Sequence, residues 1–156
     1  MTRRLDYNQV APNGAKALGG VYGYVLQSGL PGELVDLVYL RVSQINNCAY
    51  CLDMHTRELL KRGVKIEKLA LVQAWEEGGS LFSEAERAAL ELTEQGTRLA
   101  DAAEGVSDDA WLNAAKHYDE VQLGALMSLI AVINAFNRLN VITQQPAGDY
   151  VVGQFG

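Results

Sequence analysis

The sequence has 156 residues, 49% of them hydrophobic and 21% charged, with a formal net charge of −6 at pH 7. A chain of this length can bury its own core, so we expect a single domain over residues 1–156. The hydrophobic content excludes a disordered chain. The negative charge argues against nucleic acid or an anionic membrane surface as a partner, because both are bound through clustered Lys and Arg.

The N-terminal segment carries Arg3 and Arg4, but no apolar stretch follows them, so a secretory signal is not expected. The most apolar stretch, residues 123–133, is too short to cross a bilayer. We therefore expect a cytoplasmic protein. In such a reducing compartment, the two cysteines, spaced C-x-x-C, indicate a redox or metal motif rather than a structural disulfide.

Helix signals are frequent along the chain, and strand signals are scarce. Pro31 suits the first turn of a helix, Gly63 suits the position directly after the end of one, and capping-box patterns begin at Ser83 and Asp119. The expected helices cover residues 11–28, 31–45, 48–62, 66–75, 83–99, 108–118 and 119–141. We predict an all-α domain of six to eight helices. Its last helix is apolar on most of its circumference and should be the central buried one, while residues 143–156 should form a surface segment.

The helix over residues 48–62 carries both cysteines of the chain. At about 100° per residue, Cys48, Cys51 and His55 lie within about 60° of one another and share one face. Asn46 and Asn47 are natural N-cap residues, which would place Cys48 in the first turn, where the helix dipole favours a thiolate. A His four residues after Cys51 can share its proton and favours a thiolate there instead. The residues alone leave the order of the two cysteines open.

Thiol chemistry is the leading interpretation of this face. A thiolate can attack the O–O bond of a peroxide and become a sulfenic acid, and a second Cys one turn away can condense with it to a disulfide. An external dithiol then restores both thiols, with no cofactor. Three other hypotheses remain. The cysteines can be small buried hydrophobes; Cys48, Cys51 and His55 can bind zinc with His117 or Asp36; or the pair can form a redox-sensing, non-enzymatic module.

Six further polar positions are candidates for the same site. Asp36 lies within an apolar run and, with Glu33, could supply an acid near the start of the Cys helix in an antiparallel helix pair. Tyr50, between the cysteines, could donate a hydrogen bond to a peroxide or a thiolate. Asn134 is polar on an otherwise apolar helix, as are Asn137 and Arg138. These three are expected to bond across a helix or subunit contact, or to line the site.

The stretch S-Q-I-N-N-C-A-Y-C-L-D-M-H-T, residues 43–56, closely resembles the signature of the AhpD-like branch of the carboxymuconolactone decarboxylase superfamily. The similarity continues through residues 30–31, 74–75, 82–90 and 133–140 and so covers most of the chain. The resemblance implies an all-α fold, a homo-oligomer that is commonly a trimer or hexamer, and alkylhydroperoxidase activity with a dithiol or protein reductant.

By the same likeness Cys51 is the peroxidatic thiol and Cys48 the resolving one. The family's relay Glu, twelve residues before the first Cys, is the shorter Asp36 here, and Tyr50 stands where alkylhydroperoxidase D proteins have His. These two departures bear on the efficiency of peroxide reduction and on the identity of the substrate. A small carbon compound in place of a peroxide is the alternative. The lactone decarboxylase activity is not implied, because the superfamily's decarboxylases generally lack the C-x-x-C.

Overall fold

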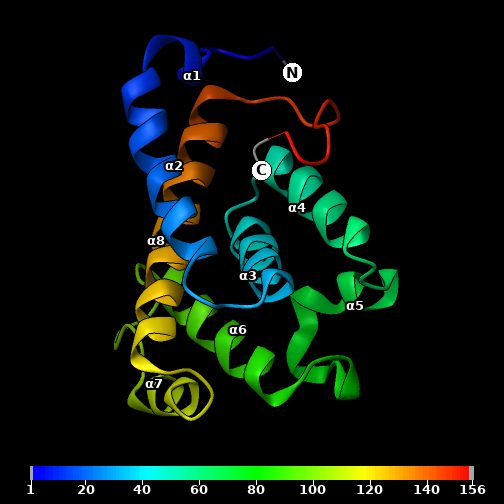
Figure 1. Cartoon of the computed structure of the whole chain (residues 1–156), viewed down its shortest axis with the longest axis vertical. Coiled ribbons are helices and arrows are strands. Elements are labelled where there is room, and N and C mark those ends of the chain that lie inside the picture. Colours follow the sequence, from blue (N-terminus) through cyan, green and yellow to red (C-terminus); the bar gives the residue numbers. More distant parts are fainter. Residues whose placement is uncertain (1, 155–156) are drawn as a thin grey trace.

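The computed structural model describes residues 2–154, and within that range all regular secondary structure is helical, with no strand. Figure 1 shows the helices grouped around one that runs through the middle of the molecule. Its α-helices are α1 (Tyr7–Val10), α2 (Pro12–Leu26), α3 (Gly32–Ile45), α4 (Ala49–Lys61), α5 (Ile66–Leu71), α6 (Glu84–Thr97), α7 (Asp108–Ala115) and α8 (Glu120–Thr143). Two 3₁₀ helices, η1 (Val72–Glu77) and η2 (Gly79–Leu81), connect α5 to α6. The all-α prediction is confirmed, and the homo-oligomer stays a prediction.

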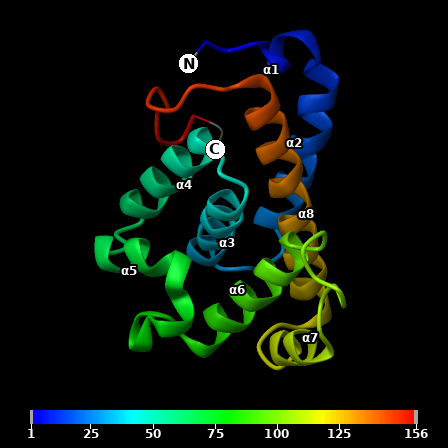
Figure 2. The same cartoon turned by 180° about the vertical axis from the view of Figure 1, so that it is seen from behind.

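The central helix is α3, not α8 as the sequence predicted. Residues 34–43 of α3 are all buried, and this helix packs against α4, α6 and α8 (Figures 1 and 2). The polar residues of α3 make its burial difficult to predict from the sequence. In the fold they are paired, and the buried Arg41, for example, donates from Nε to Glu94 at 2.6 Å. In contrast, α8 leaves Val121, Met127 and Ile142 62%, 49% and 64% exposed.

Helix α8 is nevertheless long and apolar enough, with its 24 residues, to cross a membrane by length and composition. The expectation of a stretch too short to span was therefore wrong, because the helix extends at both ends beyond residues 123–133. In the fold α8 packs on α2 and α3, and its Leu126, Leu129 and Ile133 belong to the hydrophobic core. Packing of this kind is that of a core helix.

The turn between α3 and α4 makes these two helices an antiparallel pair. Asn46 ends α3 as its C-cap, Asn47 has a positive φ of 53°, and Cys48 is itself the N-cap of α4. The predicted asparagine N-cap is thus wrong, because both asparagines are used to reverse the chain. At the other end of α4, Gly63 has a φ of +85°, as its predicted position after the helix requires.

Other helix boundaries follow the predicted capping signals closely. Ser83 and Asp119 both form complete capping boxes, at the starts of α6 and α8. The helix expected over residues 66–75 is shorter: α5 stops at Leu71 and continues as the 3₁₀ helix η1, in which Ala74 has non-helical angles. The expected ends of the helices at residues 99 and 118 also lie a few residues too far along the chain.

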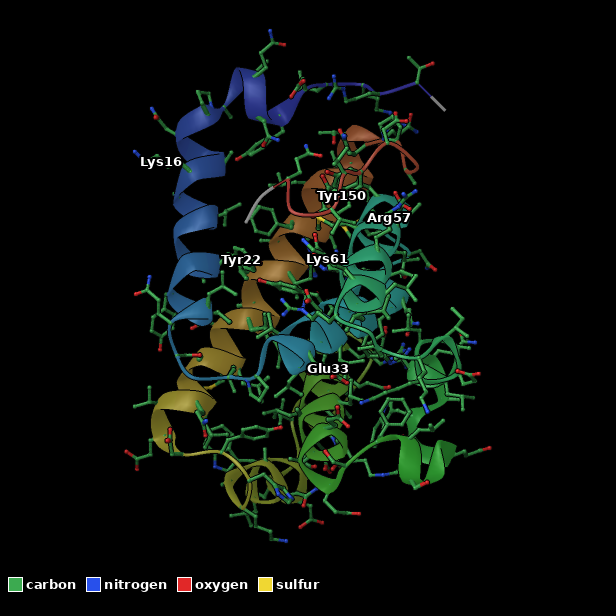
Figure 3. The ribbon with its side chains drawn as sticks, turned by 45° about the vertical axis from the view of Figure 1, so that its right-hand side comes forward. Lys16, Tyr22, Glu33, Arg57, Lys61 and Tyr150 are labelled. Atoms are coloured by element: carbon green, nitrogen blue, oxygen red, sulfur yellow. A yellow bond between two sulfur atoms is a disulfide. The ribbon has the colours of Figure 1, made fainter. Side chains whose placement is uncertain are left out.

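The C-terminal tail, residues 144–154, lies against α4 and is partly buried there. Tyr150 is 5% exposed, and its hydroxyl donates to Glu58 of α4 at 2.5 Å. The backbone N–H of Gly148 donates to Asp53 at 3.0 Å. Figure 3 shows Tyr150 beside the α4 ribbon, close to Arg57. The tail is therefore more than the surface segment that its sequence suggested, since it helps to cover the helix that carries the cysteines.

Candidate functional site

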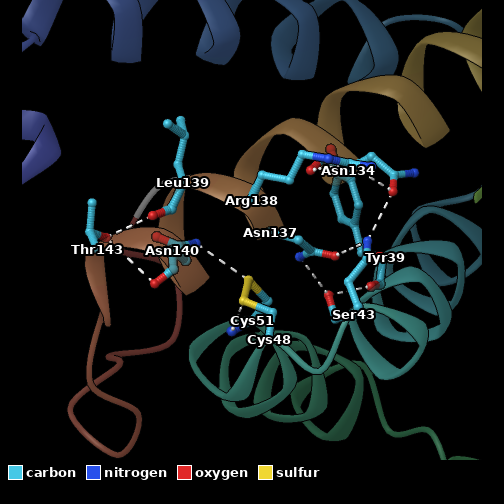
Figure 4. The surroundings of a disulfide bond; sticks show 11 residues. Tyr39, Ser43, Cys48, Cys51, Asn134, Asn137, Arg138, Leu139, Asn140 and Thr143 are labelled. Carbon is cyan, nitrogen blue, oxygen red and sulfur yellow. Dashed lines mark hydrogen bonds between the residues drawn. A yellow bond between two sulfur atoms is a disulfide. The ribbon is translucent and has the colours of Figure 1, made fainter. Parts of the chain in front are cut away.

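Cys48 and Cys51 form a disulfide at the N-terminal end of α4 (Figure 4). Their side chains are buried, with residue exposures of 1% and 0%. Because Cys48 is the N-cap, its sulfur accepts a hydrogen bond from the backbone N–H of Cys51 at 3.4 Å. The helix end thus directs a backbone N–H group at the first sulfur, which in the reduced protein would favour a thiolate.

A side chain from α8 contacts the second sulfur. The amide Nδ2 of Asn140 donates to Sγ of Cys51 at 3.3 Å (Figure 4). Sequence reasoning did not include Asn140 among the site residues. The signal was present, because Asn134, Asn137 and Asn140 recur at every third position of an otherwise apolar helix.

The other two asparagines hold the loop before the cysteines rather than the sulfurs. Asn46 donates from Nδ2 to Oδ1 of Asn134 at 2.9 Å and to Oδ1 of Asn137 at 3.0 Å. Asn137 is fully buried and donates to Ser43 at 3.1 Å. Arg138 donates to the backbone oxygen of Asn134. Asn134 therefore positions the α3–α4 turn, and it also borders a separate groove of about 590 Å³ between α6, α7 and α8.

His55 lies one helical turn beyond Cys51 and is 4% exposed. Neither ring nitrogen has a hydrogen-bond partner, so the expected bond to Cys51 is not made in this disulfide form. The ring lies against the ring of Tyr39, at 4.7 Å between centroids, and Nδ1 is 3.8 Å from Oδ1 of Asp36. The hydroxyl of Tyr39 is also without a partner. Buried unpaired polar atoms are rare in proteins and gather where chemistry is done.

Asp36 faces the C-terminal half of α4, and not the start of that helix as expected. The α3–α4 pair is antiparallel, so a residue at the start of α3 meets residues near the end of α4. Its Oδ2 accepts from Nε of Arg62 at 2.6 Å, and this hydrogen bond raises the pKa of Arg62 above its ordinary value. Glu33, the other candidate acid, pairs instead with Lys68 at 2.8 Å.

Tyr50 lies in the first turn of α4, whereas Arg62 of this ion pair is the C-cap at the other end of the helix. Its side chain is half-buried, and burial, with the charge of Asp53 second, raises the pKa of its phenol. Together with residues of both chain ends it lines a cavity of about 400 Å³, whose other members are Arg3, Gln145, Pro146, Asp149 and Gln154. Tyr50 therefore faces the tail, and it shares no hydrogen bond with either sulfur in this form.

The residues suggested as zinc ligands do not gather around one point. Over residues 2–154, no group of three or more His, Cys, Asp or Glu side chains is placed to hold a metal ion. The two sulfurs are bonded to each other, and His117 is exposed just after the end of α7. The arrangement is instead that of a disulfide with a buried imidazole one helical turn further along α4.

The sequence is similar to a known protein family and to one of its relatives in another organism. Residues 12–95 match the model of the carboxymuconolactone decarboxylase family. The uncharacterized protein YdfG of Bacillus subtilis is 36% identical over 141 residues, which are 90% of this chain and 94% of that protein.

Solved structures share the fold. A protein of unknown function from Agrobacterium tumefaciens, for which a role as the antioxidant defence protein AhpD has been suggested, has a TM-score of 0.88 and 30% identity. The match covers 96% of this chain and 100% of that chain. The debrominase Bmp8 has a TM-score of 0.72 at 21% identity, over 88% of this chain and 73% of its own, which is a likeness of fold alone.

Proposed function

The chain belongs to the carboxymuconolactone decarboxylase family and its AhpD-like superfamily, and from this premise we propose that it is a thiol-dependent alkylhydroperoxidase. One observation carries the proposal: Cys48 and Cys51 are joined in a disulfide, with His55 buried one turn further along α4. A disulfide between two cysteines one helical turn apart is the product expected when a dithiol reduces a peroxide.

The reaction begins with both cysteines reduced. The Cys51 thiolate attacks the terminal oxygen of the hydroperoxide, the O–O bond breaks, and the alkoxide leaves as an alcohol after taking a proton. Cys51 is then a sulfenic acid. The Cys48 thiolate attacks its sulfur, hydroxide leaves as water after protonation, and the disulfide forms. An external dithiol is oxidised as it returns the pair to two thiols.

Each neighbouring group has a role in this cycle. Asn140 donates to the Cys51 sulfur and would stabilise its thiolate, since a hydrogen bond to the charged form favours it. His55 would take the Cys51 proton and return it to the leaving alkoxide, as a general base and then a general acid. Asp36 faces that imidazole at 3.8 Å and would orient it, directly or through a water.

The order of the cysteines follows the family resemblance. The backbone N–H at the helix start favours a Cys48 thiolate, while Asn140 favours one at Cys51. His55, four residues after Cys51, supports Cys51 as the attacking thiol. We propose further that the protein acts without a cofactor, in the cytoplasm, with a small dithiol or a protein as reductant, and as a homo-oligomer such as a trimer or hexamer.

The decisive experiment compares the wild-type protein with Cys51→Ser and Cys48→Ser. Peroxide consumption with a dithiol donor should disappear in Cys51→Ser. In Cys48→Ser one equivalent of peroxide should leave a trappable sulfenic acid on Cys51, read by mass spectrometry. Unchanged consumption in Cys51→Ser would contradict the assignment. A wild-type disulfide that opens and closes without catalytic loss of peroxide would make the protein a redox sensor instead.

A further inference from the structure

The carboxylate of Asp36 has two cationic or potentially cationic neighbours, and it lies much closer to one of them. Its Oδ2 accepts from Nε of Arg62 at 2.6 Å, whereas its Oδ1 is 3.8 Å from Nδ1 of His55, beyond hydrogen-bond distance. The side chains of Asp36 and His55 are each 6% exposed, and that of Arg62 is 42% exposed. The buried acid is therefore bonded to a guanidinium at the surface and only faces the imidazole.

The fold makes room for this guanidinium. Gly32 begins α3, one turn before Asp36, and a Cβ atom on it would lie 2.6 Å from Nη1 and 2.9 Å from Cζ of Arg62. Any larger residue at this position would push the guanidinium aside. Arg62 is the C-cap of α4, directly before the left-handed Gly63. Its guanidinium therefore lies at the end of the helix, next to Asp36. The ion pair thus depends on Asp36, on Arg62 at the end of α4 and on the absence of a side chain at Gly32.

Other titratable groups around Asp36 do not replace Arg62. Tyr22 from α2 and Tyr39 from α3 face it, and burial raises the pKa of both phenols, so they stay neutral at ordinary pH. Glu58 from α4 adds a negative charge near Tyr22 and Arg62. Among the ion pairs of residues 2–154, Arg62 is the one permanently charged partner of Asp36.

An unpaired carboxylate this close to an imidazole would favour the protonated, cationic ring, while a carboxylate already paired to a guanidinium favours it much less. A protonated ring has no lone pair with which to take a proton from a thiol. We propose that Arg62 is a positioning residue that acts through Asp36, and that by holding this carboxylate in an ion pair it keeps His55 neutral and able to deprotonate Cys51. The role of His55 as base rests on the proposed function.

The test follows His55 and Cys51 in the reduced protein without any peroxide. NMR of the imidazole Cε1–H gives the midpoint of the His55 titration, with the exposed His117 as an internal reference. Alkylation of Cys51 by iodoacetamide across pH, read by mass spectrometry, gives the thiol's pH profile. Arg62→Gln should move the His55 midpoint and the acid limb of the profile upward by about one pH unit or more. Arg62→Lys keeps the charge and should restore most of the wild-type behaviour.

Two further variants guard the interpretation. Arg57→Gln removes another arginine of α4, one paired with Asp53 rather than Asp36, and should shift neither readout. Gly32→Ala keeps the charge of Arg62 but displaces its guanidinium, and should reproduce part of the Arg62→Gln shift. This variant tests the inference even where Arg62→Gln folds poorly. Equal shifts in Arg62→Gln and Arg62→Lys, or no shift in Arg62→Gln and Gly32→Ala, would overturn the inference. Because no peroxide is used, failure of the proposed peroxidase activity would be seen separately.

Discussion

The two ends of the α3–α4 pair use different chemistry to serve one site. At the sulfur end uncharged groups bond to one another or to sulfur, namely the amides of Asn46, Asn137 and Asn140 and the hydroxyl of Ser43. At the other end lie a carboxylate and a guanidinium. The imidazole of His55 is located between them. In the reaction that we propose, uncharged dipoles would stabilise the thiolate, while formal charge lies one step away and acts on the imidazole.

The two ends also differ in how completely their polar atoms are paired. The asparagine network around the α3–α4 turn is bonded on several sides, which fixes the backbone that carries Cys48. His55 has two buried nitrogens without a hydrogen-bond partner. Leaving such groups unpaired is costly to stability, so the asparagine network supports the turn structurally, whereas the unpaired His55 fits the role of proton carrier that we propose for it.

The largest effect is expected when the imidazole between the two ends is removed. His55→Gln should lower the rate of peroxide reduction by roughly 10²-fold or more, because a positioned general base contributes at least that much. The disulfide should still form slowly. Stopped-flow measurement of thiol loss after mixing with a hydroperoxide checks this, with His117→Gln as a control of unchanged rate. A decrease of less than a few-fold in His55→Gln would remove His55 from the mechanism.

Removing the central amide of the sulfur end should cost stability rather than chemistry. Asn137→Leu deletes a fully buried side chain that bonds to Ser43 and Asn46, and removes one hydrogen bond from each of them. We expect a loss of about 2 kcal/mol in the free energy of unfolding. Urea unfolding of the oxidised protein measures it. Asn113→Leu, on the half-buried surface of α7, should change stability by no more than about 0.5 kcal/mol.

A more local change sharpens the assignment of dipoles to the sulfur. Asn140→Leu removes the amide that donates to Cys51, so the Cys51 thiolate is less favoured and its alkylation at neutral pH slows. A net hydrogen bond of about 1 kcal/mol corresponds to a roughly fivefold lower rate. Asn134→Ala, which loses no contact with sulfur, is the matched control. Equal rates in wild type and Asn140→Leu would mean that the amide has no role in the thiol chemistry.

The smallest effect is expected from the exposed ion pair of α4. Arg57→Gln should change the free energy of unfolding by about 0.5 kcal/mol or less at neutral pH, because surface pairs contribute little. The hydrogen bond from Arg57 lowers the pKa of Asp53, so this contribution is present above the ordinary Asp pKa and is lost as pH falls through the folded value. In acid, Arg57→Gln and wild type should therefore converge, which thermal melts at several pH values would show.

Much of the fold could be predicted because its signals are local. Capping boxes at Ser83 and Asp119 and the glycine at position 63 act within a few residues, and the structure has them where predicted. The choice of α3 as the central helix was missed, because its buried charges look like a solvent face until the partners that neutralise them are known. The change to 3₁₀ geometry after Leu71 has no Gly or Pro to announce it.

The site was predictable only where one helix carries it. Helical spacing predicts that Cys48, Cys51 and His55 share one face, but it says nothing of the side chains that other helices bring. Asn140 arrives from α8, at the far end of the sequence. Arg62 resembles an ordinary cation at a helix C-terminus, and its ion pair depends on the antiparallel approach of α3 and on the absence of a side chain at Gly32.

The burial of the disulfide has a consequence for the kinetics of its reduction. With exposures of 1% and 0%, neither sulfur can be reached by an incoming thiolate while α4 is covered by the tail and by α8. Attack must wait for a transient opening of this cover. At low reductant concentration the rate should rise in proportion to the thiolate present. At high concentration it should level off at the rate of opening, which is then the same for every reductant small enough to enter.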